Sequence, residues 1–363
     1  MNSRNHKINV AIVGIGNCAS SLVQGIHYYT LHPDSPGLMH ADLAGYRPEN
    51  IRVVAAFDID KRKVGLPLHE AVYAKPNCTK RLADSLPESD VIVRMGHLLD
   101  GVSDHMSAYP EDQTFSVSNE APEDIIETLV QSGAHMLVNY LPVGSEQATA
   151  FYAECALRAG IAFVNCIPVF IGSDPEWDLK FKKAGLPLIG DDIKAQVGAT
   201  IVHRMLTKLF EDRGVELNRT YQLNVGGNTD FLNMKNHQRL SSKKISKTEA
   251  VQSQLQIPLE EDQIHIGPSD YIPFLQDQKI CYLQMEGTQF GGASMKIDLK
   301  LVVEDSPNSA GVMMDVIRGC KVALDRGMAG AIHAISAYTM KHPPRQMADD
   351  AARDALEAFI QGK

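Results

Sequence analysis

The stretch INVAIVGIGNCA at residues 8–19 carries a run of β-branched apolar residues directly into a G-x-G-x-x-A pattern. The run at Ile8–Val13 is typical of a buried strand, and apolar residues at 20–29 recur at helical spacing. Glycines between a strand and a helix permit a tight turn, and they let a pyrophosphate approach the backbone at the helix N-terminus. The order of strand, turn and helix therefore predicts a dinucleotide-binding turn. Its residues are Gly14, Gly16, Asn17, Cys18 and Ala19.

An acid follows the second predicted strand, at the end of Val53–Asp58. At that position a carboxylate accepts hydrogen bonds from the adenosine ribose and disfavours a 2′-phosphate, so Asp58 indicates NAD as the cofactor. Asp58 lies 44 residues after Gly14, where about 20 is usual. An insertion containing proline and glycine at 31–50 explains the difference. The alternative is that Asp58 is an ordinary turn residue at a strand end.

Strand-like and helix-like segments alternate through the rest of the first half. Strands are expected at 91–94, 136–141, 161–167 and 188–189, and helices at 122–132, 145–159 and 175–184. This alternation predicts a Rossmann-type, doubly wound parallel sheet of the α/β class.

Polar residues follow several of these predicted strands, at the edge where ligands bind in such sheets. They include Pro142 and Ser145 in one loop, Asn165, and the adjacent acids Asp191 and Asp192. For Ser145 the alternative is a helix cap, because Ser-x-x-Gln is a capping signal. The two adjacent carboxylates are candidates to orient a nicotinamide ring or to hold a cation.

The pattern changes after about residue 195. A helix is expected at 196–212, followed by runs of period-two alternation at 220–225, 280–286 and 295–303. Strands without intervening helices indicate a largely antiparallel sheet in an inserted α+β domain. One face of that sheet is apolar and needs a cover, for which a partner subunit is one candidate.

Helical character returns after this sheet. Ser306 is a plausible N-cap, with Pro307 in the first turn and Gly327 at the end of the helix. We therefore expect three segments: a NAD-binding domain at 1–195, a catalytic and tetramerisation domain at 196–305, and a helical return to the first domain at 306–363.

A basic run lies inside the inserted domain. Residues 231–248 contain five lysines or arginines (235, 239, 243, 244 and 247) and no acid, in a chain of net charge -9. Ser246 and Glu249 have the spacing of a capping box, which predicts a helix N-terminus there. Lysines at a helix N-terminus are tolerated if they share an anion with the backbone, which favours a pocket for a phosphorylated substrate. The alternative is a solvated basic loop.

Four lysines are candidates for catalysis if the fold brings them together: Lys243, Lys247, Lys279 and Lys341. Clustered ammonium groups lower one another's pKa and become useful general acids and bases. Asp305 is a candidate to orient one of them.

Composition restricts the class of protein. The acidic net charge argues against nucleic acid as the main partner. No apolar stretch is long enough to span a membrane, and the first seven residues do not introduce a signal peptide. The six scattered cysteines contain no C-x-x-C pair, which is typical of reduced thiols in a cytoplasmic protein.

Six segments together give the chain a resemblance to a known family. They are GIGNCASS (14–21), YLPVGSE (140–146), GDDIKAQ (190–196), VGGNTDFLN (225–233), SKKISK (242–247) and EDSPNS (304–309). In this order they resemble the myo-inositol-1-phosphate synthases, in the compact form found in bacteria. The similarity extends from about Val10 to Lys341.

The resemblance implies an isomerase that uses NAD as a recycled cofactor. Such enzymes convert glucose 6-phosphate to 1L-myo-inositol 1-phosphate by oxidation at C5, enolisation, intramolecular aldol closure and re-reduction, in inositol and phosphatidylinositol biosynthesis. Chemistry of this kind needs a hydride carrier, a phosphate site and ammonium groups that stabilise oxyanions. The family also implies a homotetramer formed through the inserted sheet, and an accessory monovalent or divalent cation.

The resemblance also assigns residues. The lysines Lys243, Lys247, Lys279 and Lys341, with Asp305, match the family's catalytic set. Cofactor binding falls to the glycine turn with Asp58, Pro142, Ser145, Asp191, Asp192 and Lys194. Asn228 and Asp230 match residues at the sugar-phosphate site, which the four lysines share. One departure is Ala195, which stands where longer members carry serine.

Two rival functions remain open at this point. A plain NAD-dependent dehydrogenase acting on another phosphorylated substrate would show net NADH production. A regulatory protein that binds NAD without catalysis would have no need of four lysines.

Overall fold

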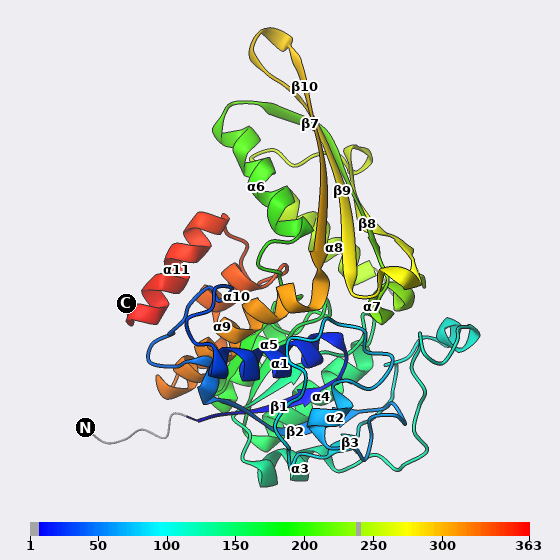
Figure 1. Cartoon of the computed structure of the whole chain (residues 1–363). Helices are drawn as coiled ribbons and strands as arrows, with labels where there is room; N and C mark the ends of the chain where they lie inside the picture. Colours follow the sequence, from blue (N-terminus) through cyan, green and yellow to red (C-terminus); the bar gives the residue numbers. More distant parts are fainter. Residues whose placement is uncertain (1–6, 237–240) are drawn as a thin grey trace.

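The structure, a computed structural model, describes residues 7–236 and 241–363, except for the side chains of residues 241, 243, 244, 268 and 269. Two sheets organise this part of the chain, and Figure 1 shows the second sheet standing out from the compact body built around the first. Arg239 of the basic run lies outside the described residues.

The first sheet is parallel throughout and has seven strands, in the order β11-β6-β5-β4-β1-β2-β3. Its strands are β1 (Ile8–Val13), β2 (Ile51–Asp58), β3 (Val93–Met95), β4 (Met136–Asn139), β5 (Ala162–Asn165), β6 (Pro187–Ile189) and β11 (Gly330–Ala331). The sheet reverses its order beside β1, so the predicted doubly wound α/β fold is confirmed.

Helices cover both faces of this sheet. One face carries α1 (Asn17–Leu31), α9 (Asp305–Asp325) and α10 (His333–Thr339), with α11 (Asp349–Gln361) beyond them; the other carries α3 (Ile125–Ser132), α4 (Glu146–Ala159) and α5 (Pro175–Ala184). Along β1, Val10 and Ile12 face the first set and Ala11 and Val13 the second. This strand is therefore apolar at successive positions because both its faces are buried.

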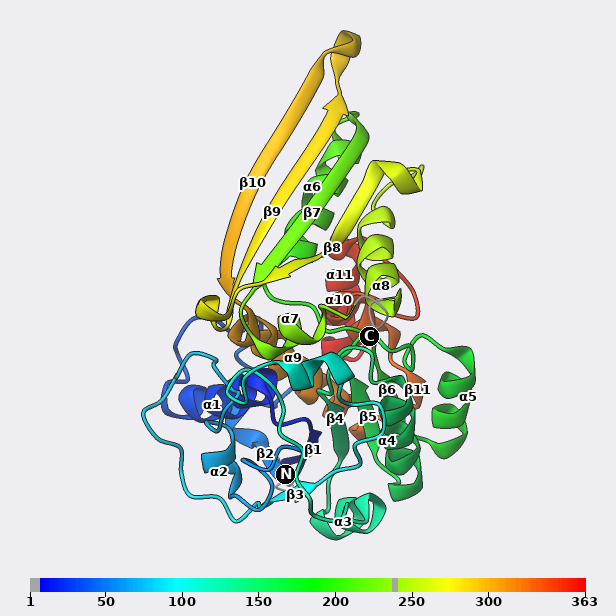
Figure 2. The ribbon, with the colours of Figure 1, turned by 90° about the vertical axis from the view of Figure 1, so that its right-hand side faces the viewer.

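The second sheet has the order β10-β9-β7-β8. It consists of β7 (Glu216–Gly226), β8 (Ile264–Tyr271), β9 (Gln278–Thr288) and β10 (Ser294–Glu304). Its helices are α6 (Ala199–Asp212), α7 (Thr229–Asn233) and α8 (Ser241–Gln252). Figure 2 shows α6 and α8 on one face of this sheet.

Strand β8 was not expected from the sequence, and it pairs with β7 in parallel. The sheet is consequently mixed, although its other two pairings are antiparallel as predicted. The segment 262–278 lacks a clean alternation because Gly267 and Pro268 interrupt it, which hides the strand.

Short helices complete the described chain. They are α2 (Leu68–Ala71), η1 (Pro48–Asn50), η2 (Asp104–Ala108), η4 (Glu261–Gln263), η5 (Pro273–Leu275) and η6 (Phe290–Gly292).

Several helix starts differ from the predicted ones. Helix α3 begins at Ile125 rather than near 122, because the side chain of Asp124 caps it by accepting the N–H of Glu127 at 2.9 Å. Helix α6 begins at 199 rather than 196. Ser306 lies inside α9 and is not its N-cap, since the helix starts directly after Glu304.

The C-terminal segment packs back onto the first sheet. Strand β11 pairs with β6, and α9 packs along α1. Arg318 of α9 also anchors the insertion between α1 and β2, donating hydrogen bonds to the carbonyls of His40, Ala41 and Tyr46. All six cysteines are free. Within 7–236 and 241–363, no helix combines the length and apolar character needed to cross a membrane.

Candidate active site

One cavity runs from the carboxyl edge of the first sheet to the near end of the second sheet. The walls include the glycine turn after β1, Asp58 at the end of β2, and Lys279 on β9. The cavity therefore joins the glycine turn of the first sheet to charged side chains at the near end of the second sheet.

The glycine turn forms one end of this cavity. Gly14 has φ +87°, and a Cβ atom there would lie 2.6 Å from the carbonyl oxygen of Tyr140. At Gly16 a Cβ atom would meet nothing within 4 Å, so the backbone is open toward the cavity. No side chain caps α1, which begins directly after Gly16. This end thus offers backbone N–H groups to an anion.

Asp58 holds the turn in shape from the end of β2. Its Oδ2 accepts the backbone N–H of Ile15 at 2.7 Å, and its Oδ1 accepts those of Ile59 and Asp60 at 2.7 and 2.9 Å. A carboxylate has about four acceptor positions, so three backbone bonds leave one free for a ribose hydroxyl. The predicted acid therefore serves the turn as well as lining the cavity.

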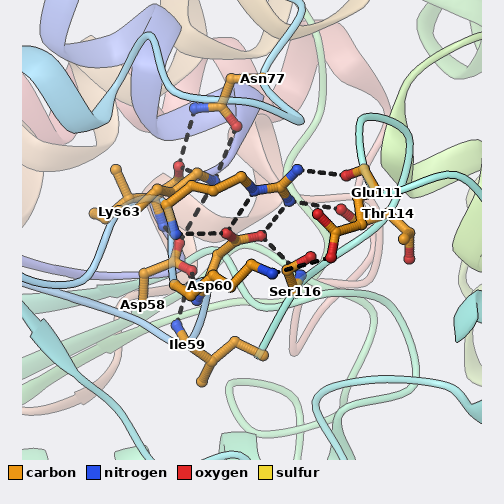
Figure 3. Close-up of polar contacts among 11 residues, drawn as sticks. Asp58, Ile59, Asp60, Lys63, Asn77, Glu111, Thr114 and Ser116 are labelled. Atoms are coloured by element: carbon orange, nitrogen blue, oxygen red, sulfur yellow. Dashed lines mark hydrogen bonds and ion pairs between the residues drawn. The ribbon is translucent and has the colours of Figure 1, made fainter. Parts of the chain in front are cut away.

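Lys63 is a member of this end that the sequence did not single out. It is buried, lines the cavity, and donates to the carbonyl of Ile15 at 2.8 Å and to Oδ1 of Asn77 at 3.0 Å. Its Nζ lies 3.7 Å from Oδ2 of Asp58. Figure 3 shows this contact beside the network of Asp60. No motif marks a lysine five residues after the acid, so only the fold reveals the pair.

Asp60 and Arg62 fasten the loop 99–121 next to this pair. Arg62 donates to Asp60 through Nε at 2.8 Å and to the carbonyls of Glu111 and Thr114, and the N–H of Ser116 donates to Asp60 at 3.0 Å. Burial works against the charge of Asp60, but these donors outweigh it and lower its pKa. These contacts fasten the loop 99–121 to the turn that follows β2.

The loop after β4 contributes only part of what was expected. Pro142 lines the cavity. Ser145 is buried, and its hydroxyl donates to the carbonyl of Pro142 at 2.6 Å. Ser145 is not among the lining residues and does not cap α4. Asp100 does so instead, accepting the N–H groups of Gln147 and Ala148 at 2.8 and 2.9 Å.

The two adjacent acids after β6 point to different places. Asp191 accepts the N–H groups of Ile171, Gly172 and Ser173 and the side-chain amide of Asn165, at 2.8–3.1 Å. Burial raises the pKa of Asp191 to about 6 in spite of these donors. It does not line the cavity and stabilises the loop after β5.

Asp192 does line the cavity, which Asp191 does not. Its Oδ1 accepts from Nζ of Lys341 at 2.7 Å, and its Oδ2 accepts from the hydroxyl of Ser246 at 2.8 Å. Because the two carboxylates diverge, they do not form a joint cation site. In the described part of the chain, no three His, Cys, Asp or Glu side chains gather as metal ligands.

Lys194 is placed away from the cavity. Its Nζ donates to the carbonyl of Ala337 at 2.9 Å and to Asp349 at 3.3 Å. Burial and the neighbouring charge of Arg204 lower the pKa of Lys194 to about 8. The expected cofactor role of Lys194 therefore has no geometric support, because its ammonium group stabilises the packing of α10 and α11.

Three of the four candidate lysines line the cavity: Lys247, Lys279 and Lys341. Lys279 pairs with Asp305, whose Oδ1 lies 3.3 Å from its Nζ. Burial works against the charge of Lys279, but Asp305 and then Asp230 outweigh it and raise its pKa. Lys243 lies one turn before Lys247 in α8, and its side chain is outside the described residues.

The helix start predicted at Ser246 is wrong, because the helix begins five residues earlier within the basic run. Helix α8 starts at Ser241, so Ser246 is an interior residue and does not form a capping box with Glu249. The hydroxyl of Ser246 instead donates to Asp192. Lys247 reaches the cavity from the middle of the helix, where helix-terminus electrostatics do not apply.

An open helix N-terminus does line the cavity elsewhere, at α6. Its N-cap is Gly198, no side chain caps it, and Gly198, Ala199 and Thr200 are lining residues. Backbone N–H groups at such a terminus bind anions. The sequence signal was Gly198 before an amphipathic helix, and the predicted helix start at 196 was three residues too early.

Asn228 and Asp230 also reach the cavity, through the start of α7. Asn228 is its N-cap and accepts the N–H groups of Asp230 and Phe231 at 3.1 and 3.2 Å. The lining thus combines ammonium groups, carboxylates and two uncapped helix N-termini. That arrangement can bind two phosphorylated ligands and move protons between them.

Known proteins are similar to this sequence over nearly its whole length. A family model described as myo-inositol-1-phosphate synthase matches residues 198–306. The chain is 53% identical over 363 residues to the inositol-3-phosphate synthase of Mycolicibacterium smegmatis, with 98% of each chain covered. It is 52% identical over 361 residues to the inositol-3-phosphate synthase of Corynebacterium glutamicum, covering 97% of this chain and 98% of that one.

A solved structure is similar as well. It is that of a myo-inositol-1-phosphate synthase-related protein from Thermotoga maritima, which superimposes with a TM-score of 0.79 at 25% identity. The alignment covers 98% of this chain and 99% of that one. Both sheets are therefore part of the shared architecture.

Proposed function

The chain belongs to the myo-inositol-1-phosphate synthase family, and we propose that it converts D-glucose 6-phosphate to 1L-myo-inositol 1-phosphate with the division of labour described below. The observation that carries the proposal is a single cavity lined by the glycine turn, by Lys247, Lys279 and Lys341, and by Asp192 and Asp305. It supports a cofactor site beside a set of proton donors and acceptors within one enclosure.

NAD fits the glycine-turn end of the cavity. The open backbone at Gly16 and the uncapped N-terminus of α1 suit a pyrophosphate, and Asp58 keeps one acceptor position for a ribose hydroxyl. Bound there, NAD supplies a reversible hydride acceptor, so oxidation and re-reduction leave no net change. Besides Pro142 and Asp192, the hydroxyl of Tyr140 belongs to this wall, and it is buried without a partner among the described residues.

The sugar phosphate is proposed to bind at the N-terminus of α6. Three observations support this: the helix has no side-chain cap, its first residues Ala199 and Thr200 line the cavity, and Lys247 and Lys279 line the same cavity. Asn228 and Asp230 would contact the sugar hydroxyls from the start of α7. Helix dipole and ammonium groups together stabilise a phosphate more than either does alone.

The lysines are proposed to handle protons and oxyanions. Lys341 is held by Asp192 and Lys279 by Asp305, so each ammonium group has a fixed position. A positioned ammonium group stabilises the oxygen of an enolate, and it can return a proton to that oxygen. Lys247 and Lys243, one turn apart on α8, complete the set.

A product assay tests the function. Purified protein is incubated with glucose 6-phosphate and NAD+, and inositol phosphate is quantified while NADH absorbance is followed. We expect inositol phosphate without net NADH. Net NADH without inositol phosphate would replace this proposal by the dehydrogenase alternative.

Several finer assignments are also proposals. We divide the chain into a NAD-binding domain (1–195), a catalytic and assembly domain (196–305) and a helical return (306–363). A homotetramer would form through the second sheet, because the apolar row Met295, Ile297, Leu299 and Leu301 on its edge strand β10 is only partly buried. A cytoplasmic location agrees with six free cysteines. A cation would be tested by dialysis against a chelator.

A further inference from the structure

Asp277 is a buried carboxylate with no part in the chemistry described above. It is 1% exposed, precedes β9, and stands two residues before Lys279. It is not among the residues that line the cavity. Burying a carboxylate is costly unless its oxygens are hydrogen-bonded, so its contacts indicate its role.

Three segments of the chain meet at this side chain. Oδ1 of Asp277 accepts from Nδ2 of Asn228 at 3.0 Å and from the hydroxyl of Ser306 at 2.8 Å, and Oδ2 accepts the N–H of Ser306 at 3.1 Å. The side chain of Thr79 also hydrogen-bonds to the carboxylate. The carbonyl oxygen of Asp277 accepts the N–H of Asp305 at 2.9 Å.

Two of these segments belong to the sugar end of the cavity. The bonds to Ser306 and Asp305 fix the start of α9, and Asp305 is the partner of Lys279. The bond to Asn228 fixes the cap of α7, which places Asp230 in the cavity wall.

The third segment belongs to the cofactor end. The hydroxyl of Thr79 lies 2.8 Å from that of Ser21 on α1. Oδ1 of Asn17, the first residue of α1, accepts the N–H groups of Cys78 and Thr79 at 2.7 and 3.0 Å. Because Asn17 follows Gly16 directly, this short segment is tied to the backbone that faces the pyrophosphate.

We propose that Asp277 is a positioning residue that holds the Lys279–Asp305 pair in register with the glycine turn. The inference rests on the proposed function, because register matters only if cofactor and sugar occupy the one cavity. Hydride transfer requires the reacting atoms at near-contact distance, and a displacement of about 1 Å can cost about 10²-fold in rate.

The charge of Asp277 adds a second consequence. Burial and the nearby charge of Asp305 raise its pKa to about 6. The ionisable groups that interact with it are Asp305 on α9, Cys18 on α1 and Cys78 in the loop. Because burial disfavours the charged form of Asp277, its carboxylate becomes protonated below about pH 6 and loses one hydrogen-bond acceptor. The Lys279–Asp305 pair is then held less firmly relative to the glycine turn.

The test compares two buried acids. Asp277→Asn keeps the shape of the side chain and removes its charge. We expect kcat to fall about 10- to 100-fold. We expect Tm to stay within about 4 °C of wild type, because removal of the buried charge offsets the loss of one hydrogen bond. Asp315→Asn is the control, since Asp315 is equally buried but binds His40 and Arg318 away from the cavity. It should lower Tm and leave kcat unchanged.

A pH profile separates positioning from bulk stability. In the wild type, kcat should decline as the pH falls through about 6. In Asp277→Asn this decline should be absent, because the group no longer titrates. A purely structural role would leave the shape of the profile unchanged.

Thr79→Val provides a second variant in case Asp277→Asn does not fold. It removes only the hydroxyl on the cofactor side, and Thr79 does not line the cavity. We expect kcat to fall several-fold and the Michaelis constant for NAD to rise.

The outcomes are distinct. Wild-type kcat in both variants, or a lowered Tm with normal kcat, would overturn the inference and leave the proposed function intact. A wild-type protein that makes no inositol phosphate would remove the proposed function and, with it, the inference. The inference is supported if Asp277→Asn lowers kcat, preserves Tm and no longer shows the decline of kcat as the pH falls through about 6.

Discussion

At the cofactor end of the cavity the lining residues Asp58 and Lys63 form hydrogen bonds mainly with the backbone, whereas at the sugar end charged side chains form them with one another. Asp58 and Lys63 bind the N–H and the C=O of the same residue, Ile15. Lys341 and Lys279 instead pair with the side chains of Asp192 and Asp305. The first arrangement fixes the shape of a turn. The second holds each lysine ammonium group, with the protons that it can transfer, beside a carboxylate.

The difference follows from what each end has to bind. A dinucleotide is recognised by an unchanging surface, so the groups that build the surface are held in place by backbone hydrogen bonds, with one acceptor position of Asp58 left for the ribose. A substrate that develops and loses charge needs groups whose protons can move. Substitutions at the sugar end should therefore lower kcat, and those at the cofactor end should weaken NAD binding.

The largest effect is expected for Lys279→Met. It removes an ammonium group from the cavity and leaves Asp305 without this partner, so kcat should fall about 10²- to 10³-fold. Steady-state assay of inositol phosphate measures it. The control is Lys183→Met on the outer surface of α5, where activity should be unchanged. Equal activity of both variants would contradict the catalytic role of Lys279.

A smaller effect separates the two adjacent acids. Asp192→Asn should lower kcat about 10- to 100-fold because Lys341 loses its charged partner. Asp191→Asn should lower Tm by several degrees, through lost backbone acceptors, at nearly normal kcat. Calorimetry measures the Tm, and steady-state kinetics the kcat, of both variants. The reverse pattern would mean that the roles of the two acids are exchanged.

At the cofactor end, Lys63→Met should raise the Kd for NAD about tenfold with little change in kcat at saturating NAD. The reason is that the carbonyl of Ile15 and the carboxylate of Asp58 lose a charged neighbour. Lys61→Met is a matched control, because Lys61 lies in the same turn but forms an exposed pair with Glu111. Titration calorimetry measures the Kd for NAD of both variants. An unchanged Kd for Lys63→Met would contradict the proposed difference between the two ends of the cavity.

The smallest effect lies outside the cavity. The hydrogen bond to Asp315, aided by Glu357, outweighs burial and raises the pKa of His40 to about 9. Since this value exceeds the ordinary one near 6.5, the stabilisation is complete below about pH 6.5 and is lost as the pH rises through 9. In the wild type, thermal melts should give a lower Tm at pH 9.5 than at pH 6.5. His40→Gln should reduce this difference and leave kcat unchanged. Equal losses in both proteins would exclude His40 as the cause.

Local patterns predicted much of the fold. The strand at Ile8–Val13, the glycine turn and the alternation up to residue 189 are confirmed, because each depends on neighbours in sequence. Strand β8 was missed, since parallel pairing with β7 supplies hydrogen bonds that its irregular sequence does not reveal. Capping was the least predictable feature: Asp100 caps α4 from a distant loop in place of Ser145.

The candidate site divides in the same way. Sequence alone determined which residue types are present: the glycine turn, the acid after β2, the basic run, and the motifs that led to Lys279 and Lys341. Tertiary structure alone decided how they are used. Asp191 and Asp192 are neighbours in sequence but face different environments, and Lys63 and Asp277 carry no motif. The physical reason is that the partner of a buried charge comes from a distant segment, so its role is set only when the chain has packed.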